Sequence, residues 1–180
     1  MYKVISYITC LLFMFNIPIA GLCQTNQDEW EKNCLPKYRF NGKKFVLTEN
    51  QWKERLTYEQ FNILRKQGTE LPFQNAYFAN KEKGIYECAG CNLPLFSSDA
   101  KYDSGTGWPS FTQPICSNNI MYKKDYQFLV FFPRVEVLCN RCDGHIGHLF
   151  DDGPPPSNKR YCVNSAALRF ISKDFPDGQE

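Results

Sequence analysis

Four cysteines stand in two closely spaced pairs, a pattern that suits metal binding. The pairs are Cys88 with Cys91 and Cys139 with Cys142, and each encloses two residues. This spacing lets two sulfurs converge from one tight turn, and two such turns supply the tetrahedral thiolates that zinc accepts. Because four protein ligands leave no open position, we predict a structural zinc site that joins two distant parts of the chain.

Two alternatives remain open for these four cysteines. They could form disulfides within or between the pairs, or one pair could be a thioredoxin-like redox centre. A redox pair normally opens a helix after a strand, and neither pair does so clearly. Unrelated proteins carry such cysteine sets, so the pattern indicates a metal without indicating an activity.

A second group of residues is suited to nucleophilic chemistry. His145 and His148 are the only histidines, and Cys162 follows them in a segment that reads as a strand. A cysteine with histidines available is a candidate nucleophile, Arg160 could stabilise its thiolate, and Asn164 would share its face on a strand. The alternative is that Cys162 is a small core residue and that the histidines are surface residues or additional zinc ligands.

Short strands must position both groups of residues. Beyond Pro72 the chain becomes aromatic and is punctuated by glycine, proline, asparagine and aspartate, a texture typical of strands and turns. The predicted strands are Ile85–Cys88, Met121–Phe132, Val135–Leu138, His148–Phe150, Arg160–Val163 and Ala167–Ile171. We therefore expect a mainly antiparallel β fold.

Two short helices are expected before the strands. Thr48 with Gln51 and Thr57 with Gln60 each have the spacing of a capping box. Apolar residues then recur at helical intervals, which predicts helices over 49–56 and 58–67. Gly68 is a suitable stop for the second helix.

The first 23 residues differ from the rest. Lys3 precedes an apolar stretch, and small residues follow before Cys23, which is the form of a secretory signal peptide. We therefore expect the secretory pathway, that is, secretion, an endoplasmic reticulum lumen or a periplasm. The alternatives are an uncleaved membrane anchor, although the apolar stretch is short for a span, and a buried helix.

Net charge and cysteine count limit which binding partners and which cysteine pairings are expected. The net charge is +2 with both signs interspersed, so nucleic acid is not expected as a partner. The cysteine count of 9 is odd, which argues that at least one cysteine stays free or pairs outside the chain.

Longer stretches resemble a known family. The segments 102–111, 134–137, 144–154 and 160–170 follow, in order, those of the B-type methionine sulfoxide reductases, and the match runs from about Leu47 to Phe170. The resemblance implies two antiparallel sheets, with helices at the N-terminal end and zinc on the side away from the active site. On this basis we expect a mobile lead-in over 24–46, a catalytic domain over 47–172 and a tail over 173–180.

The resemblance also implies a reaction. Cys162 would attack the sulfur of a methionine-R-sulfoxide and become a sulfenic acid, since one enzyme type serves each epimer. His145 or His148 would protonate the departing oxygen. The substrates would be oxidised proteins and, more weakly, free methionine sulfoxide. Thioredoxin or another thiol would regenerate the enzyme. The enzyme is expected to be a monomer.

Further site residues come from the same resemblance. Trp108 would pack against the substrate methyl group, with Phe150 as a second wall. Asp152 would orient a histidine or a water, Asn164 would position the substrate or Cys162, and Arg160 would stabilise the thiolate. The alternative for each is a packing role.

The chain departs from the family pattern at Thr106. Many relatives have a cysteine here that resolves the sulfenic acid by forming a disulfide with Cys162, which threonine cannot do. Instead, an external thiol could reduce the sulfenic acid directly, or Cys34 or Cys116 could act as the resolving cysteine. The alternative for Cys34 and Cys116 is a free thiol or a structural disulfide.

Two other classes of function remain open. A non-catalytic zinc-stabilised module that binds oxidised methionine would hold zinc and consume no sulfoxide. A secreted disulfide-rich structural protein would hold no zinc and have few free thiols.

Overall fold

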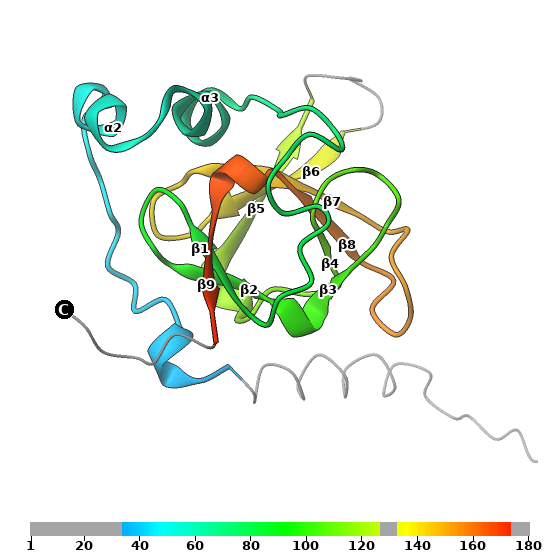
Figure 1. Cartoon of the computed structure of the whole chain (residues 1–180). Helices are drawn as coiled ribbons and strands as arrows, with labels where there is room; N and C mark the ends of the chain where they lie inside the picture. Colours follow the sequence, from blue (N-terminus) through cyan, green and yellow to red (C-terminus); the bar gives the residue numbers. More distant parts are fainter. Residues whose placement is uncertain (1–33, 127–132, 174–180) are drawn as a thin grey trace, which may run out of the picture.

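A computed structural model describes residues 34–126 and 133–173 of the chain (Figure 1). The predicted signal peptide (1–23), the first part of the lead-in, residues 127–132 of the predicted strand Met121–Phe132 and most of the tail lie outside the described residues. Among the described residues, no helix has both the length and the apolar character to cross a membrane.

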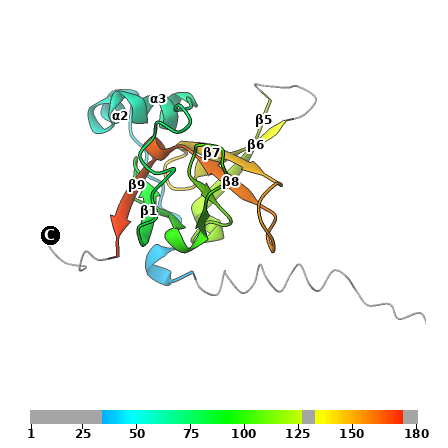
Figure 2. The ribbon, with the colours of Figure 1, turned by 45° about the vertical axis from the view of Figure 1, so that its right-hand side comes forward.

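The two predicted helices are confirmed. Helix α2 spans Glu49–Arg55 and helix α3 spans Tyr58–Lys66. Thr48 and Thr57 each cap a helix and form the reciprocal pair of hydrogen bonds with the glutamine three residues on. These boxes satisfy amide groups at each helix start that would otherwise lack a partner. Both helices lie over one end of the sheets (Figures 1 and 2).

The strands form two antiparallel sheets. The three-stranded sheet has the order β2 (Pro94–Ser97), β1 (Gly84–Cys88) and β9 (Leu168–Ser172). The six-stranded sheet has the order β3 (Lys101–Tyr102), β4 (Ser110–Phe111), β8 (Arg160–Val163), β7 (His145–Phe150), β6 (Arg134–Cys139) and β5 (Ile120–Asp125). Single turns of 3-10 helix, η1 to η4, lie at Pro36–Tyr38, Ser98–Ala100, Ser117–Asn119 and Ser165–Ala167. The mainly β, two-sheet prediction is confirmed.

An aromatic cluster packs the two sheets together. Tyr86 and Phe96 come from the small sheet and Phe111 from the large one, and all three are fully buried. The rings of Phe96 and Phe111 stack at 4.4 Å, and those of Tyr86 and Phe111 meet edge to face at 5.1 Å. Burial of each such side chain contributes about 1.5–3 kcal/mol, so this cluster is a main source of cohesion between the sheets.

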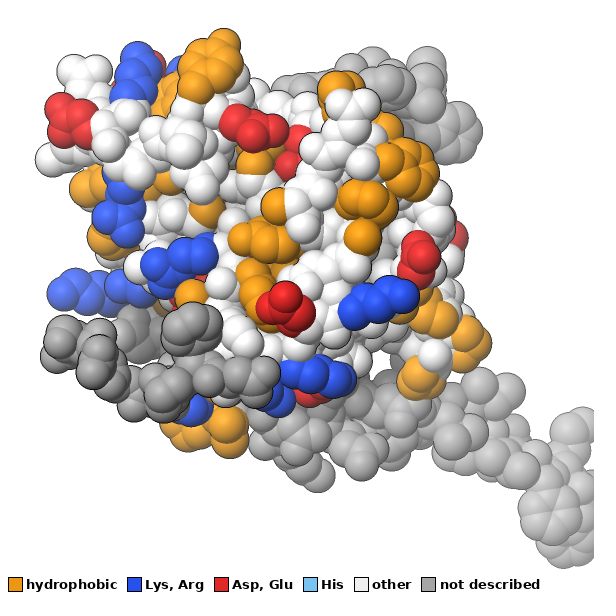
Figure 3. Space-filling view, in the orientation of Figure 1, with side chains coloured by type: hydrophobic (Ala, Val, Ile, Leu, Met, Phe, Trp, Pro, Cys, Tyr) orange, Lys and Arg blue, Asp and Glu red, His pale blue; other side chains and the backbone are white. Residues whose placement is uncertain are grey.

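On the face in Figure 3, charged side chains of both signs lie among apolar ones.

The described part of the lead-in predicted over 24–46 contacts the rest of the chain from Cys34 onwards. Cys34 forms a disulfide with Cys116, and both residues are buried. Farther along, the Phe40 amide donates to the Asn119 side chain at 2.8 Å, and the Phe45 amide donates to the Arg141 carbonyl oxygen at 2.7 Å. These long-range contacts could not be predicted from the weak pattern of the segment.

Candidate active site and metal centre

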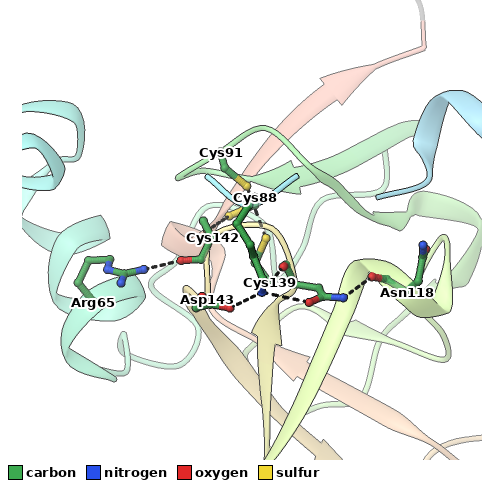
Figure 4. A network of polar contacts seen from close by, with 9 residues as sticks. Arg65, Cys88, Cys91, Asn118, Cys139, Cys142 and Asp143 are labelled. Atoms are coloured by element: carbon green, nitrogen blue, oxygen red, sulfur yellow. Dashed lines mark hydrogen bonds and ion pairs between the residues drawn. The ribbon is translucent and has the colours of Figure 1, made fainter. Parts of the chain in front are cut away.

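The four paired cysteines converge on one point between the sheets. Cys88 ends β1 and Cys139 ends β6, while Cys91 and Cys142 lie in the turns that follow (Figure 4). All four are buried, and their sulfurs lie within 4.8 Å of one another. The Cys88–Cys142 and Cys91–Cys139 sulfur distances are 3.6 and 3.5 Å. Zinc–sulfur bonds of about 2.3 Å imply tetrahedral edges of ~3.8 Å, so the set fits a zinc ion.

Both cysteine turns are built in the same way. Asn92 and Asp143, each four residues after the first cysteine of a pair, have φ of 62° and 58°. Their amides donate to the carbonyl oxygens of Cys88 and Cys139 at 2.8 and 2.9 Å. Asparagine and aspartate tolerate this left-handed conformation better than most residues. The two turns therefore present their sulfurs in similar ways from different sheets.

Arginines surround the cysteine turns. Arg55, Arg65 and Arg141 donate to the carbonyl oxygens of Gly90, Cys142 and Cys91 at 2.7, 2.8 and 3.2 Å. Four thiolates with one divalent ion carry a net charge of about −2, which these cations offset. Hydrogen bonds from the other sulfurs, with burial, raise the pKa of Cys88, so a bound cation is what would keep it a thiolate. None of the four is in a disulfide.

One row of side chains crosses the large sheet and contains Cys162. Tyr102, Ser110, Cys162, His148 and Glu136 are successive cross-strand partners on β3, β4, β8, β7 and β6. Directly opposed residues of antiparallel strands point to the same face, with strands about 4.8 Å apart. The sheet therefore brings the candidate nucleophile beside one histidine.

A β-bulge brings the second histidine to the same face. Residues three apart on a regular strand point to opposite faces. Between Val137 and Leu138 the register with β7 shifts, so that Gly147 and His145 are their partners and Ile146 is an extra residue. As a result, the rings of His145 and His148 lie edge to face with centroids 5.3 Å apart.

Carboxylates hold both histidines. His145 Nδ1 lies 2.7 Å from Glu136 Oε1, which also accepts from Gln67 at 2.9 Å. His148 Nε2 lies 2.9 Å from Asp125 Oδ2. Burial lowers the pKa of both histidines, while the carboxylate partners act in the opposite direction. Among the described residues, the buried Nε2 of His145 has no hydrogen-bond partner.

Arg160 lies between Cys162 and an acidic partner. Its guanidinium forms two hydrogen bonds with Asp152, at 2.8 and 2.9 Å, and lies 4.3 Å from the Phe150 ring centroid. Asp152 thus orients Arg160, while its expected part in orienting a histidine or a water stays a prediction. Burial raises the pKa of Cys162, whereas Arg160 and a hydrogen bond from Thr106 lower it.

Asn164 and Trp108 are both fixed by the segment around Glu70. Asn164 is 4% exposed and its side chain donates to the Ile146 carbonyl oxygen at 3.1 Å and accepts from the Glu70 amide at 3.2 Å. It therefore fixes the bulge, and its expected part in positioning the substrate or Cys162 stays a prediction. The Trp108 indole donates to the Glu70 carbonyl oxygen at 3.2 Å.

The sequence did not reveal several partners in this site. Glu70, Asp125 and Glu136 sit in segments where their neighbours in sequence give no sign of a histidine or tryptophan nearby. Cys34 and Cys116 are joined to each other, so neither offers a thiol to Cys162 in this oxidised form. The structure keeps Thr106 beside Cys162 instead.

Comparisons with known proteins give a consistent match. The SelR domain family matches residues 56–172. Peptide methionine sulfoxide reductase MsrB of Methanosarcina barkeri is 50% identical over 127 residues, which cover 71% of this chain and 88% of that protein. The chloroplastic reductase B1 of Arabidopsis thaliana is 54% identical over 123 residues, covering 68% of this chain and 60% of that protein. MsrB of Methanosarcina mazei is 49% identical over 137 residues, which cover 76% of this chain and 96% of that protein. Among solved structures, the Mis18 'Yippee-like' domain superposes with a TM-score of 0.38 at 17% identity, over 51% of this chain and 97% of that chain.

Proposed function

The chain belongs to the SelR-domain family of B-type peptide methionine sulfoxide reductases, and we propose that it reduces protein methionine-R-sulfoxide through the sulfur of Cys162. The enzyme is an oxidoreductase of this family. The observation that best supports Cys162 as the nucleophile is its position opposite His148 on neighbouring strands, with Arg160 beside it. Free methionine sulfoxide would be a weaker substrate.

The reaction transfers one oxygen atom from substrate to enzyme. The Cys162 thiolate attacks the sulfoxide sulfur while a proton reaches the sulfoxide oxygen, which gives an adduct with a bond between the two sulfurs and a hydroxyl on the substrate sulfur. The hydroxyl then passes to the Cys162 sulfur as the bond between the two sulfurs breaks, and methionine leaves with the electron pair. Cys162 is thereby a sulfenic acid, so the substrate sulfur is reduced and the cysteine sulfur is oxidised by two electrons. Arg160 stabilises the thiolate that starts the reaction.

His148 is the better-placed proton donor of the two histidines. Its side chain is 13% exposed and lies opposite Cys162, whereas that of His145 is 3% exposed. Asp125 accepts a hydrogen bond from Nε2 of His148 and favours its protonated form. Because burial lowers its pKa, protonated His148 is a stronger acid than an exposed histidine and delivers its proton more readily.

The substrate would lie beside Trp108. The indole is held by the Glu70 carbonyl oxygen, so its ring presents a fixed wall for the methyl group of the sulfoxide. A groove of about 540 Å³ next to it is lined by Phe73, Phe78 and Tyr102, among others, and would receive the polypeptide on one side of the oxidised methionine. Phe150 lies under Arg160 and would be a more distant wall.

An external thiol would return Cys162 to the thiol. A first thiol converts the sulfenic acid to a mixed disulfide and water, and a second thiol releases Cys162 and leaves with the first as a disulfide. Thr106 beside Cys162 and the disulfide between Cys34 and Cys116 support this route. Thioredoxin-like proteins are the expected class of reductant.

One zinc ion per chain would occupy the cysteine cluster. Cys88 and Cys91 hold it from the small sheet, and Cys139 and Cys142 from the large one. Zinc supplies stability there, because the closed set of ligands leaves no position for a substrate. We propose that the enzyme acts as a monomer.

The secretory pathway is the proposed location. The buried disulfide between Cys34 and Cys116 supports an oxidising compartment. The form of the first 23 residues supports the same pathway, with a membrane anchor at the N-terminus as the alternative.

The test offers peptides with R and S methionine sulfoxide together, with dithiothreitol as reductant, and follows each epimer by chiral separation. We expect selective loss of the R epimer, and we expect Cys162→Ser to abolish it while zinc content and thermal unfolding stay unchanged. If neither epimer is lost with folded, zinc-loaded protein, the catalytic proposal fails and a module that binds oxidised methionine takes its place.

A further inference from the structure

Glu70 carries a buried carboxylate that the reaction proposed above does not use. The residue is 8% exposed. One carboxylate oxygen accepts from the Ser165 amide, and the other accepts from the Ala166 amide at 2.9 Å. These two amides belong to the η4 turn, which follows Cys162 closely in the sequence. Because both oxygens accept and a buried carboxylate needs partners, the two amides determine where this side chain lies.

The main chain of Glu70 contacts two residues of the candidate site. Its amide donates to Asn164 Oδ1 at 3.2 Å, and its carbonyl oxygen accepts from the Trp108 indole at 3.2 Å. The two partners are 94 and 38 positions away in the sequence. One residue therefore contacts both the proposed wall for the substrate methyl group and the asparagine that fixes the β7 bulge.

Asn164 extends this network to the histidines. Its side chain and its amide both donate to the Ile146 carbonyl oxygen, at 3.1 and 2.9 Å. Ile146 is the extra residue of the bulge, which brings His145 to the same face as His148. The position of Glu70 is thus linked to the strand that carries both histidines.

Polar contacts, more than apolar burial, hold the segment that begins at Glu70. The side chains of Leu71 and Phe73 are exposed. Farther along, the Gly107 carbonyl oxygen accepts from the Phe73 amide at 2.9 Å and from the Asn75 side chain at 2.7 Å. These contacts fix the later part of the segment, so the first part depends on the carboxylate of Glu70.

We propose that Glu70 is a positioning residue, whose carboxylate is held by the Ser165 and Ala166 amides and fixes the main chain that aligns Trp108 with Asn164. This inference rests on the proposed function, in which Trp108 is the wall for the sulfoxide methyl group. A fixed wall accepts a methyl group and disfavours a larger alkyl group, because close packing leaves no room for another methylene. Glu70 thus contributes to the selection of methionine sulfoxide by the size of its alkyl group.

The kinetic test compares two peptides, one with methionine-R-sulfoxide and one with ethionine-R-sulfoxide, with zinc-loaded protein and dithiothreitol. Glu70→Gln keeps the size of the side chain but replaces one acceptor oxygen with an NH2 group, which cannot accept from an amide. We expect kcat/KM for the methyl substrate to fall about ten-fold. The preference for the methyl over the ethyl substrate should fall about five-fold. Loss of folded protein alone would lower both rates equally and leave this preference unchanged.

A second measurement needs no substrate. Deuterium exchange of the Trp108 indole N–H is followed by NMR in isotope-labelled, zinc-loaded protein, and Trp108→Phe assigns the resonance. We expect exchange about ten-fold faster in Glu70→Gln, because the carbonyl oxygen that accepts from the indole is no longer held in place. The indole of Trp52, which is buried, is the internal reference and should exchange alike in both proteins.

Two further variants complete the design. Glu70→Asp keeps the charge but is one methylene shorter, so it cannot reach both amides from the same backbone position. It should change both measurements in the same direction, and it serves if Glu70→Gln does not fold. Glu87→Gln is the matched control, because Glu87 pairs with Arg169 at 2.6 Å on the small sheet, and it should retain the parent values. Parent-like values for both Glu70 variants would overturn the inference.

The two proposals fail in different ways. Indole exchange needs no methionine sulfoxide, so faster exchange in Glu70→Gln from a protein without reductase activity would contradict the proposed function alone. An active reductase whose Glu70 variants keep the parent preference for the methyl substrate would contradict this inference alone.

Discussion

At the scale of single residues, a pair of carboxylates and a hydroxyl affect the pKa values of the proposed reactive groups. Glu136 and Asp125 each form a hydrogen bond with one ring nitrogen of a histidine. The other ring nitrogen of each histidine is left for a second partner. Thr106 and Arg160 act on the sulfur in the same sense, since both favour its charged form. The reactive groups are thus tuned by neighbours from other strands.

Removal of the Asp125 carboxylate should shift the pH dependence of turnover. Asp125 raises the pKa of His148, so Asp125→Asn lowers it further. If His148 must be protonated to act, activity is lost as pH rises through its pKa, and in the variant this loss moves to lower pH. The measurement is a pH profile of kcat/KM for the R-sulfoxide peptide. In the same assay, His148→Gln should lower kcat/KM about 100-fold.

Asp99→Asn is the matched control for this experiment. Asp99 pairs with Lys83 at the surface at 2.8 Å, and its loss should leave the pH profile in place. A profile of Asp125→Asn that superimposes on the parent would exclude Asp125 as a partner of the proton donor.

At the scale of elements, the bulge in β7 is what lets one strand present two histidines to one face. Ile146 is the extra residue, and its carbonyl oxygen accepts from both the amide and the side chain of Asn164. Gly147 follows and lets β8 approach closely. The element that carries the histidines is therefore fixed by backbone contacts as well as by side chains.

A methyl group at Gly147 should disturb this arrangement. A Cβ there would lie 2.1 Å from the Cys162 carbonyl oxygen, so β7 and β8 would have to move apart. We expect Gly147→Ala to destabilise the fold by about 1–3 kcal/mol and to lower activity, as overpacked sites do. Thermal unfolding and reductase assays would measure both.

The control is Gly90→Ala, whose Cβ would lie 3.4 Å from the Trp52 ring. It should lose much less stability than Gly147→Ala. Equal effects of the two substitutions would show that close approach of β8 is not the cause.

At the scale of the whole molecule, three devices hold the two sheets and the lead-in together. The aromatic cluster of Tyr86, Phe96 and Phe111 fills the space between the sheets. The cysteine cluster would join the ends of β1 and β6 through the proposed zinc ion, and the disulfide joins Cys34 to Cys116. None of these devices uses a residue of the Cys162 row.

Loss of the disulfide should therefore affect stability more than catalysis. It closes a loop with a sequence separation of 82 residues, so its removal in Cys34→Ala/Cys116→Ala should cost about 2–4 kcal/mol. Multiple-turnover activity with a thioredoxin system should persist in the double variant. Denaturant unfolding and that assay test the two parts, and turnover limited to one cycle would restore a resolving role to these cysteines.

The sequence by itself determined the features that depend on near neighbours. Both helices follow from capping boxes that lie within four residues, and the cysteine pairs follow from a spacing fixed by one turn. Cys162 and the two histidines could be singled out because they are scarce and clustered. The roles proposed for them come from the resemblance to a family rather than from the pattern.

Only the tertiary structure decided what lies across strands. Strands β3 and β4 have two residues each, too few to show a period, yet they place Tyr102 and Ser110 in the row of Cys162. Asp125 and His148 form a hydrogen bond although they are 23 positions apart in the sequence. Cys34 and Cys116 form a disulfide although they are 82 positions apart. Such contacts are set by strand pairing and register, which depend on the packing of the whole chain rather than on any local pattern.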